Sequence, residues 1–238
     1  MLLEGRNAVK EALNSDTTIE KILIAKGSDD NSIKMIVAIA KKKGVRVDYV
    51  ERKVLDKTSE TGKHQGVIAY STEYKYFELE DILAKKEGRR IILLLDGIED
   101  PHNLGSIIRA AECHGVDGVV IPKMRSASVN ETVIRASCGA TQYVKVVKVT
   151  NINDVIRKLK DEFIKVVALD MQGERIDKAY LDGDIALVVG NEGKGVSRLT
   201  ADLCDEKVSI PMFGEVSSLN ASVATGIALY ECCRQLRK

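Results

Sequence analysis

Polar side chains that could do chemistry stand directly behind an apolar run in the middle of the chain. The run IILLL at 91–95 is typical of a strand buried on both faces of a parallel sheet, and Asn103 and Arg109 follow it closely. Open α/β sheets place ligand sites at the carboxyl ends of such strands, where an amide can orient a substrate and a guanidinium can bind a phosphate. Taken alone, the two residues are explained better by a helix N-cap and a surface charge.

A glycine-containing loop follows a second apolar run. The segment GNEGKGVS at 190–197 comes directly after 185–189, and its glycines let the backbone approach a ligand where a side chain would collide. Its order, G-x-x-G-x-G, matches neither the dinucleotide-binding fingerprint nor the phosphate loop of nucleoside triphosphatases. On spacing alone, a tight turn and a binding loop are about equally supported.

A third polar cluster, SSLN at 217–220, lies between a short strand ending at Ile210 and a final helix expected from about Ser218 to Leu236. Either Ser218 or Asn220 could simply cap that helix. The small and apolar residues behind them at 221–229 predict an apolar helix face, which suits packing against another helix or another subunit.

The elements that must position these clusters alternate along the whole chain. Strands are expected at 22–24, 45–50, 67–70, 91–95, 118–121, 144–149, 165–169 and 185–189, and helices at 7–13, 32–43, 79–86, 103–114 and 152–162. This alternation predicts an α/β protein with a mostly parallel sheet in its second part. We place one domain at 1–73, a charged linker at 74–90 and a second domain at 91–238. The polar, glycine-containing loop 58–66 is a candidate for binding contacts.

Composition limits the class of protein. The chain has 238 residues, 45% hydrophobic and 30% charged, which is typical of a soluble globular protein. A formal net charge of +1 gives no overall basic footprint, so RNA binding would depend on local patches. Five cysteines without C-x-x-C spacing, no signal peptide and no apolar run near ~20 residues predict a cytoplasmic protein with reduced thiols, no metal site and no membrane contact.

Together, the three clusters resemble in order and spacing the three motifs of the SpoU (TrmH) family of RNA ribose 2′-O-methyltransferases. The matching segments are DPHNLGSIIRAAECHGVDGV, LVVGNEGKGVS and IPMFGEVSSLNASVA, so the resemblance spans the chain from Ile91 onward. The N-terminal part is similar, over the shorter stretches LLEGRNAVKEAL and KHQGVIA, to the substrate-binding domain of the RlmB-like subgroup of 23S ribosomal RNA guanosine methyltransferases. Three separated motifs that agree are far more specific than any one of them.

The resemblance implies a fold, a cofactor and a site. It implies a small L30e-like α/β RNA substrate-binding domain at 1–73 and a SPOUT-class α/β methyltransferase domain at 91–238 with a deep trefoil knot. The knot would build a pocket for S-adenosyl-L-methionine (AdoMet), and the domain would form a homodimer in which the small residues Ala221, Ala224 and Ala228 take part. The implied cofactor-binding residues are Gly190, Ile210 and Leu219, with Leu169 as a further pocket wall, and the implied catalytic residues are Asn103, Arg109, Glu192, Ser218 and Asn220.

The implied reaction is methyl transfer to a ribose 2′-hydroxyl of RNA. Ribosomal RNA is preferred over transfer RNA because of the N-terminal domain, and a guanosine target is implied by the subgroup alone. In the family, the counterpart of Arg109 is often described as the base, but a guanidinium stays protonated in proteins. We therefore expect Arg109 to bind a phosphate or the developing alkoxide, with Asn103 orienting Arg109 and the ribose. The family commonly has a β-branched residue where this chain has Ala221, and Asn191 stands at a variable position of the second motif. Neither removes a proposed catalytic group.

Two other classes of function fit parts of the sequence. A non-catalytic RNA-binding protein would use the lysines at 41–43 and the loop around His64 as phosphate contacts, although such a lysine run is more typical of a solvated helix end. A dehydrogenase on a doubly wound sheet lacks the required fingerprint. Among the histidines, His102 is only adjacent to the site, and His114 is expected to have a structural or capping role.

Overall fold

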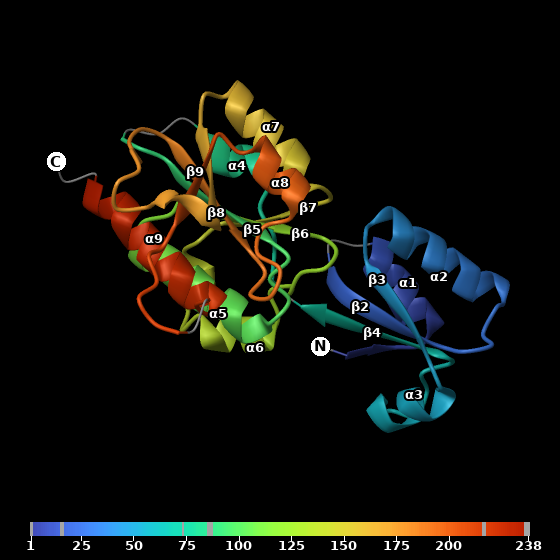
Figure 1. Cartoon of the computed structure of the whole chain (residues 1–238). Coiled ribbons are helices and arrows are strands. Elements are labelled where there is room, and N and C mark those ends of the chain that lie inside the picture. The colour runs from blue at the N-terminus through green and yellow to red at the C-terminus, as the bar shows by residue number, and fades with distance from the viewer. Residues whose placement is uncertain (1, 15–16, 73, 85–87, 216–217, 236–238) are drawn as a thin grey trace. The chain divides into compact units, whose positions relative to one another are not determined.

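The computed structural model describes residues 2–14, 17–72, 74–84, 88–215 and 218–235, and it divides into two compact units (Figure 1). The first unit is Met1–Lys75 and the second is Tyr76–Lys238. The first contains 14 Lys and Arg against 11 Asp and Glu, a formal charge of +3, and the second contains 22 against 24, a charge of −2. The near-neutral chain is therefore a basic unit joined to an acidic one.

The first unit is a mixed four-stranded sheet with helices. Its strands are β1 (Leu2–Glu4), β2 (Thr18–Ala25), β3 (Arg46–Val50) and β4 (Val67–Thr72), and its helices are α1 (Arg6–Asn14), α2 (Asn31–Lys42) and α3 (Arg52–Thr58). In the sheet order β1-β4-β2-β3, only β2 and β3 run parallel. Asp30 starts α2 by accepting hydrogen bonds from the backbone of Ser32 and Ile33. Ile33, Ile36 and Ala40 then bury one face of that helix in the core.

The polar loop at 58–66 is held to β1 by one carboxylate. Glu4 accepts hydrogen bonds from Ser59 Oγ at 2.6 Å, from the amide of Glu60 at 2.6 Å and from the hydroxyl of Thr61. The hydrogen bonds from the side chains of Ser59 and Thr61 lower the pKa of Glu4 to about 2. His64 in the same loop is 3% exposed and bonds Asp56 Oδ1 at 2.9 Å. His64 therefore braces the loop, and it is not available to contact a phosphate.

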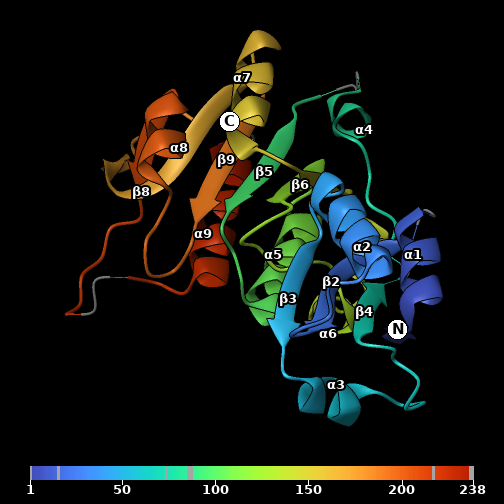
Figure 2. The ribbon, with the colours of Figure 1, turned by 90° about the vertical axis from the view of Figure 1, so that its right-hand side faces the viewer.

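The second unit is built on a six-stranded sheet in which every paired neighbour runs parallel (Figure 2). Its strands are β5 (Ile91–Asp96), β6 (Gly118–Pro122), β7 (Val146–Val149), β8 (Lys165–Arg175), β9 (Ile185–Gly190) and β10 (Glu206–Ser209), in the order β10-β8-β9-β5-β6-β7. The apolar run Ile91–Leu95 of β5 is buried throughout, as predicted. All six carboxyl ends consequently lie along one edge of the sheet.

Helices of the second unit connect and cover these strands. They are α4 (Leu79–Leu83), α5 (Pro101–Cys113), α6 (Glu131–Ala136), the 3₁₀ turn η1 (Ala140–Gln142), α7 (Ile152–Asp161), α8 (Arg198–Leu203) and α9 (Ala221–Gln235). The short elements β1, α3, α6, η1 and α8 were not predicted, because segments of three to seven residues show no clear period. The two-part α/β fold is confirmed, and the trefoil knot stays a prediction.

Two helix starts differ from the sequence prediction, and both differences have a capping cause. Asp100 caps α5 by accepting from the amides of His102 and Asn103 at 3.1 and 3.3 Å, with Pro101 at the first helical position. The N-cap role considered for Asn103 is therefore wrong, since Asn103 lies within the first turn. Asn220 caps α9 by accepting from Ser222 N at 2.9 Å, so that helix starts after the expected Ser218. Leu236, its expected end, lies outside the described residues.

Residues 76–83, expected in the linker, pack as part of the second unit. Phe77 donates its amide to Val146 O at 2.9 Å and bridges β7. Ile82 of α4 is 3% exposed and belongs to the core under the sheet. Gly118 opens β6 beneath it, and a Cβ at that glycine would lie 2.3 Å from Ile82 Cγ2. None of the helices in the described ranges is long and apolar enough to cross a membrane.

Candidate functional site

The parallel register brings the first two motifs together at the carboxyl edge of the sheet. Asp96, the last residue of β5, pairs with Gly190, the last residue of β9. Both strands then leave the sheet at the same level, and the segments 97–100 and 191–197 start side by side. Asp96 Oδ2 also accepts the amide of Ser197 at 2.9 Å, which ties the far end of the second segment back to the first strand.

One carboxylate joins all three motifs. Glu192 Oε1 accepts a hydrogen bond from Asn103 Nδ2 at 2.7 Å, from Asn220 Nδ2, and from the backbone amide of Ala221 at 3.3 Å. Asn220 Nδ2 also reaches Asn103 Oδ1 at 2.9 Å. We call Asn103, Glu192 and Asn220 the polar hub. Hydrogen bonds to an ionised carboxylate are about twice as strong as neutral ones, so the hub holds the three segments in a fixed arrangement.

Glycine is required where the second motif leaves β9. A Cβ at Gly190 would lie 2.0 Å from the carbonyl carbon of Gly195 and 2.1 Å from Val196 N, both backbone atoms that cannot move aside. The loop closes through two hydrogen bonds between the backbones of Asn191 and Gly195. The side chain of Asn191 then donates to Gly97 O at 2.9 Å and accepts from Gly193 N at 2.9 Å. Asn191, which the sequence analysis treated as a variable position, therefore braces the loop.

A cavity of about 420 Å³ lies beside the polar hub. All four residues predicted to bind the cofactor line it, and so do two of the predicted catalytic residues; these six are Leu169, Gly190, Glu192, Ile210, Ser218 and Leu219. Asp170 and Met171, which continue β8, and Met212 also line the wall. No sequence motif indicated these three residues, although Asp170 directly follows the predicted strand 165–169 at the same sheet edge.

Arg109 stands on α5 outside the polar hub. It is exposed, and its Nη1 donates to Cys138 Sγ at 3.4 Å. This contact depends on the close approach of α5 and α6, because a Cβ at Gly105 would lie 2.5 Å from Ala136 Cβ. Among the residues that the structure describes, Arg109 pairs with no carboxylate, and Asn103 contacts Glu192 and Asn220 rather than Arg109. The expectation that Asn103 orients Arg109 is not supported by these contacts.

Two further sequence expectations are settled by contacts. His114 ends α5, and its Nδ1 lies 2.7 Å from Ala110 O, so its structural role is confirmed. The small residues of α9 do not form an outer face: Ala221 and Ala228 are buried inside the unit, and Ala224 lines the cavity. The exposed apolar residues of α9 are instead Val223, Ile227 and Tyr230.

A glycine-edged cavity at the carboxyl edge of a parallel sheet is the ligand site of an α/β enzyme. The chain belongs to the SpoU rRNA Methylase family, whose model matches residues 90–230. A second model, described as RNA 2′-O ribose methyltransferase substrate binding, matches residues 2–77. The resemblance noted in the sequence is thereby confirmed, and the protein is an RNA methyltransferase with a separate substrate-binding domain.

Relatives cover nearly the whole chain. A Bacillus subtilis (strain 168) protein named as a TrmH family tRNA/rRNA methyltransferase, YacO, is 42% identical over 236 residues, which span 97% of this chain and 94% of that protein. The crystal structure of the SpoU methyltransferase AviRb from Streptomyces viridochromogenes in complex with AdoMet aligns with a TM-score of 0.64 at 25% identity, covering 100% of this chain and 91% of that one. An AdoMet-bound rRNA methyltransferase from Sinorhizobium meliloti aligns with a TM-score of 0.63 at 25% identity, covering 99% and 87%.

The cavity fits AdoMet, the cofactor of this family. Its volume is within the range of roughly 300 to 1,000 Å³ that is usual for small-molecule sites. Leu169, Ile210 and Leu219 supply apolar walls for a purine face, and the main chain beside them supplies donors and acceptors for its edge. Asp170 and Glu192 line the cavity together with Lys194, so the lining holds two acidic residues and one basic residue, which suits a ligand that carries a sulfonium, an ammonium and a carboxylate group.

Proposed function

We propose that this protein transfers a methyl group from AdoMet to the 2′-hydroxyl of a ribose in ribosomal RNA, with a guanosine of 23S ribosomal RNA as the target. The observation that carries the proposal is the polar hub: it joins three sequence-remote motifs at the rim of the cavity, and the exposed guanidinium of Arg109 lies on α5, the helix that also carries Asn103. Such an arrangement can hold a cofactor on one side and RNA on the other.

The chain's own residues have a limited task in this reaction. Bound AdoMet supplies a methyl group that is already activated by its positively charged sulfur. The protein must align that methyl with the ribose oxygen and ease the loss of the hydroxyl proton, because a neutral hydroxyl is a poor nucleophile. We assign alignment to the cavity walls and to the polar hub, with main-chain groups of Gly190, Ile210 and Leu219 holding the cofactor and Ser218 shaping the rim.

Arg109 is proposed to stabilise negative charge rather than to accept the proton. A guanidinium has donors only and stays protonated, so it cannot act as a base in its ordinary form. Its exposure, and the lack of a carboxylate partner among the described residues, leave its donors available to an RNA phosphate or to the developing alkoxide. The proton then leaves to water or to a phosphate oxygen as the carbon–oxygen bond forms and the carbon–sulfur bond breaks.

The charges of the two units support an RNA substrate and a role for the first unit in binding it. The first unit carries +3 and the second −2, so the long-range attraction for a phosphate backbone comes from the first unit. The match of residues 2–77 to a substrate-binding model supports the same assignment. A transfer RNA substrate is the alternative, which the printed name of the Bacillus subtilis relative includes.

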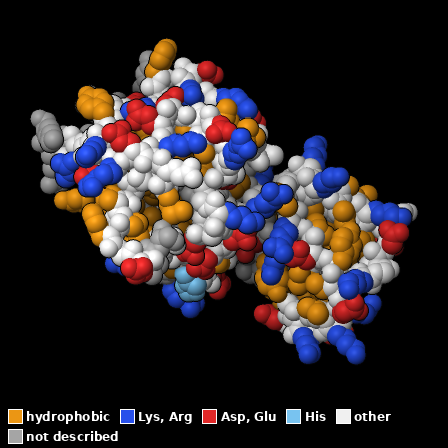
Figure 3. Space-filling model, in the orientation of Figure 1, with side chains coloured by type: hydrophobic (Ala, Val, Ile, Leu, Met, Phe, Trp, Pro, Cys, Tyr) orange, Lys and Arg blue, Asp and Glu red, His pale blue; other side chains and the backbone are white. Residues whose placement is uncertain are grey.

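We also propose that the second unit forms a homodimer through α9. Val223 is 50% exposed and Tyr230 62% exposed, with Ile227 between them on the same helix face. Figure 3 shows hydrophobic side chains on the surface in the region where α9 runs in Figure 1. Burial of such an apolar face against a second copy removes it from water. Light scattering should give twice the chain mass, and Val223→Asp with Tyr230→Asp should give a monomer with the second unit still folded.

The experiment that tests the proposed reaction uses RNA from a strain of the source organism that lacks the gene. Purified protein and tritiated AdoMet should restore one 2′-O-methyl mark to its 23S ribosomal RNA, at a guanosine that mass spectrometry can locate. Restoration of a mark in transfer RNA alone would overturn the substrate assignment. AdoMet binding without transfer to any RNA would favour a non-catalytic RNA-binding protein.

Arg109→Lys separates the two roles considered for the guanidinium. Lysine keeps the charge but loses the paired donor geometry, so we expect kcat to fall on the order of 100-fold with RNA still bound. Arg135→Lys, a second exposed arginine on the neighbouring α6, is the matched control and should stay within about twofold. Near-normal turnover of Arg109→Lys would contradict the paired-donor role.

A further inference from the structure

Among the residues that the structure describes, four other than glycine have a backbone φ in the left-handed region: Gln65, Arg125, Cys138 and Phe163. Phe163 and Cys138 follow the C-terminal caps of α7 and α6, where this conformation commonly ends a helix. Gln65 is held by Arg6, which donates its backbone amide to Oε1 and its Nε to the carbonyl. Arg125 has a φ of 56°. It neither follows a helix C-terminal cap nor is held by hydrogen bonds of the kind that Arg6 makes to Gln65. A bulky residue in this region costs about 1 to 2 kcal/mol, so its retention needs a reason.

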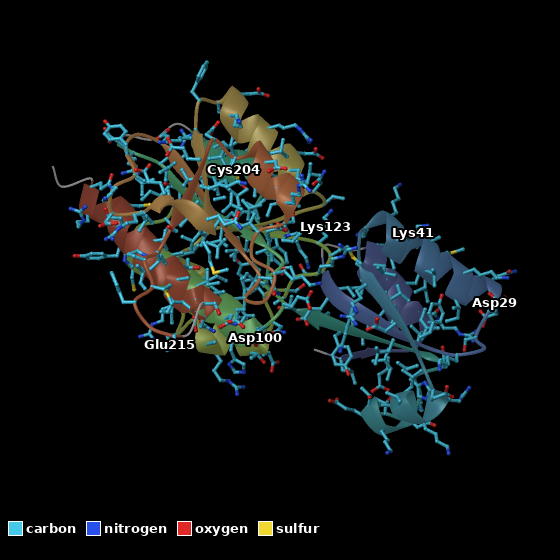
Figure 4. All side chains as sticks on the ribbon, in the orientation of Figure 1. Asp29, Lys41, Asp100, Lys123, Cys204 and Glu215 are labelled. Atoms are coloured by element: carbon cyan, nitrogen blue, oxygen red, sulfur yellow. The ribbon has the colours of Figure 1, made fainter. Side chains whose placement is uncertain are left out.

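Arg125 lies in a loop that is fixed at several points. The loop 123–130 joins β6 to α6, and Figure 4 labels Lys123 at its start. Lys123 N donates to Val149 O at 2.7 Å, Ala127 N donates to Ile98 O at 2.7 Å, and Val129 N donates to the hydroxyl of Tyr76 at 2.8 Å. These bonds surround Arg125 on both sides along the chain. The left-handed backbone is therefore held by its neighbours, and the side chain is presented from a rigid base.

The loop borders the candidate active site. The carbonyl of Arg125 would lie 3.7 Å from a Cβ at Gly97, and Gly97 O is the acceptor of Asn191 Nδ2. Ile98, whose carbonyl receives Ala127 N, lies two residues before Asp100, the cap of α5 that Figure 4 also labels. Arg125 thus lies beside the segments that carry the first and second motifs. Its loop follows β6, the strand next to β5 in the sheet.

The charge of Arg125 is not neutralised by the protein. Its side chain is exposed, and within the described ranges it forms no ion pair or hydrogen bond. The side chain of Lys123, two residues earlier, is half-buried and likewise forms no ion pair or hydrogen bond within these ranges. The second unit has more acidic than basic residues, and many of its cations are paired, such as Arg157 with Asp154 and Arg175 with Asp177. Among the described residues, Arg109 and the cavity-lining Lys194 also form no ion pair, so Arg125 adds to a group of cations near the site that no carboxylate of this unit neutralises.

We infer that Arg125 binds a backbone phosphate of the RNA next to the nucleotide in the active site. The inference rests on the proposed function, because it assigns one contact of the same RNA. A guanidinium held rigidly beside the reacting ribose can fix the strand without reading its sequence. The energetic cost of the left-handed backbone is then the cost of aiming this side chain at the strand.

Arg125→Gly is the decisive variant, because glycine adopts the left-handed backbone without strain. The loop keeps its shape, and the melting temperature should stay equal or rise. Filter binding to deproteinised 23S ribosomal RNA from the strain lacking the gene should give a Kd about 3- to 10-fold higher at low salt. The slope of log K against log salt concentration should become less steep by about 1, and the Kd for AdoMet should stay within about twofold.

Phe163→Gly is the matched control. Phe163 has a φ of 58° and is 95% exposed, but it ends α7 and its backbone amide is bonded within that helix end. Relief of the same backbone strain there should stabilise the protein similarly without any change in RNA binding. Arg125→Asn is the second variant, since asparagine tolerates this backbone and carries no charge. Arg125→Asn should show the same increase in the Kd for RNA, and it replaces Arg125→Gly as the test if the glycine variant folds poorly.

An RNA affinity and a salt slope of both Arg125 variants equal to those of the wild type would overturn the inference. A different result would contradict the proposed function: wild-type protein that binds AdoMet but restores no methyl mark to the RNA. Arg125→Lys adds detail: recovery of most of the affinity with the wild-type salt slope supports a phosphate contact.

Discussion

The two sheets of this protein show how strand direction decides where function can gather. In the second unit, all paired strands are parallel, and the segments after β5 and β9, together with the end of β8 and the residue after β10, line or border one cavity. In the first unit, β4 runs antiparallel to both of its neighbours, so the segment after β4 leaves the sheet at the opposite edge from the segments after β1, β2 and β3. The parallel sheet brings the carboxyl ends of all its strands to one edge, where the cavity lies, whereas the mixed sheet divides the carboxyl ends of its strands between two edges.

The same contrast appears in how charge is used. In the second unit, the carboxylate of Glu192 accepts hydrogen bonds that join three motifs. In the first unit, the carboxylate of Glu4 accepts hydrogen bonds from a single loop. The basic excess belongs to the first unit and the cavity to the second. On the proposed assignment, long-range attraction of RNA belongs mainly to the first unit and cofactor binding to the second, so variants of the first unit should leave AdoMet binding unchanged.

Gly190→Ala should have the largest effect. The added Cβ meets backbone at 2.0 Å, so the loop 190–195 cannot close, and we expect a loss of at least about 3 kcal/mol from the second unit. Thermal unfolding measures this. Gly193→Ala is the control, because its Cβ meets only Asn191 Oδ1 at 3.7 Å, and its melting temperature should be unchanged. Equal melting temperatures for both variants would contradict the close approach.

Glu192→Gln should give the next largest effect. The neutral amide weakens the hydrogen bonds from Asn103 and Asn220, and we expect kcat/KM for RNA to fall on the order of 100-fold. AdoMet affinity, measured by calorimetry, should fall as well, because Glu192 lines the cavity. Glu162→Gln, at an exposed helix end of the same unit, controls for the lost charge and should behave like the wild type. Full activity of Glu192→Gln would remove the hub from the mechanism.

Gly118→Ala tests whether residues 76–83 belong to the second unit. The added Cβ lies 2.3 Å from Ile82 Cγ2, so α4 must shift, at a cost of about 1 to 3 kcal/mol. Combined with Ile82→Ala, which removes the clashing methyl, the double variant should be more stable than the sum of the two single losses predicts. Strict additivity in urea unfolding would mean that α4 does not pack on β6.

Glu4→Gln should have the smallest effect at neutral pH and a distinct effect in acid. Since the folded pKa of Glu4, about 2, is below its ordinary value of 4.5, its stabilisation is fully present above pH 4.5 and is lost as the pH falls toward 2. Amide exchange in 59–63 should therefore speed up across this window in the wild type, and the variant should show no such dependence. Glu11→Gln, exposed on α1, is the control and should keep the wild-type profile.

Much of the fold could be predicted because long periodic segments carry their own signal. The run 91–95, the α7 region and the strand at 185–189 each show a clear pattern, and their positions are confirmed. Helix starts were predicted less well, because several neighbouring polar residues could each cap the same helix. The pair Asp100-Pro101 carries a start signal for α5 that the search for apolar period overlooked.

The site was found from motifs, and its connections required the structure. The family resemblance implied Asn103, Glu192 and Asn220 as separate site residues, but nothing in the sequence indicates that two amides meet one carboxylate oxygen. Asn191 was noted only as a variable position and Arg125 was not noted, because neither a hydrogen bond to Gly97 O nor an unusual backbone angle leaves a pattern in the sequence. The roles assigned to the site residues stay predictions for the variants above to test.

The contacts of the polar hub also determine when, during translation, the cofactor pocket can form. Asn220 bonds Asn103 across 117 residues of sequence, and the cavity is lined by residues as late as Ala224. The first unit can fold while the rest is still being translated. The cofactor pocket, by contrast, stays incomplete until the segment that contains Asn220 has left the ribosome. A chain interrupted before that point can carry a folded RNA-binding unit and yet have no place to hold a methyl donor.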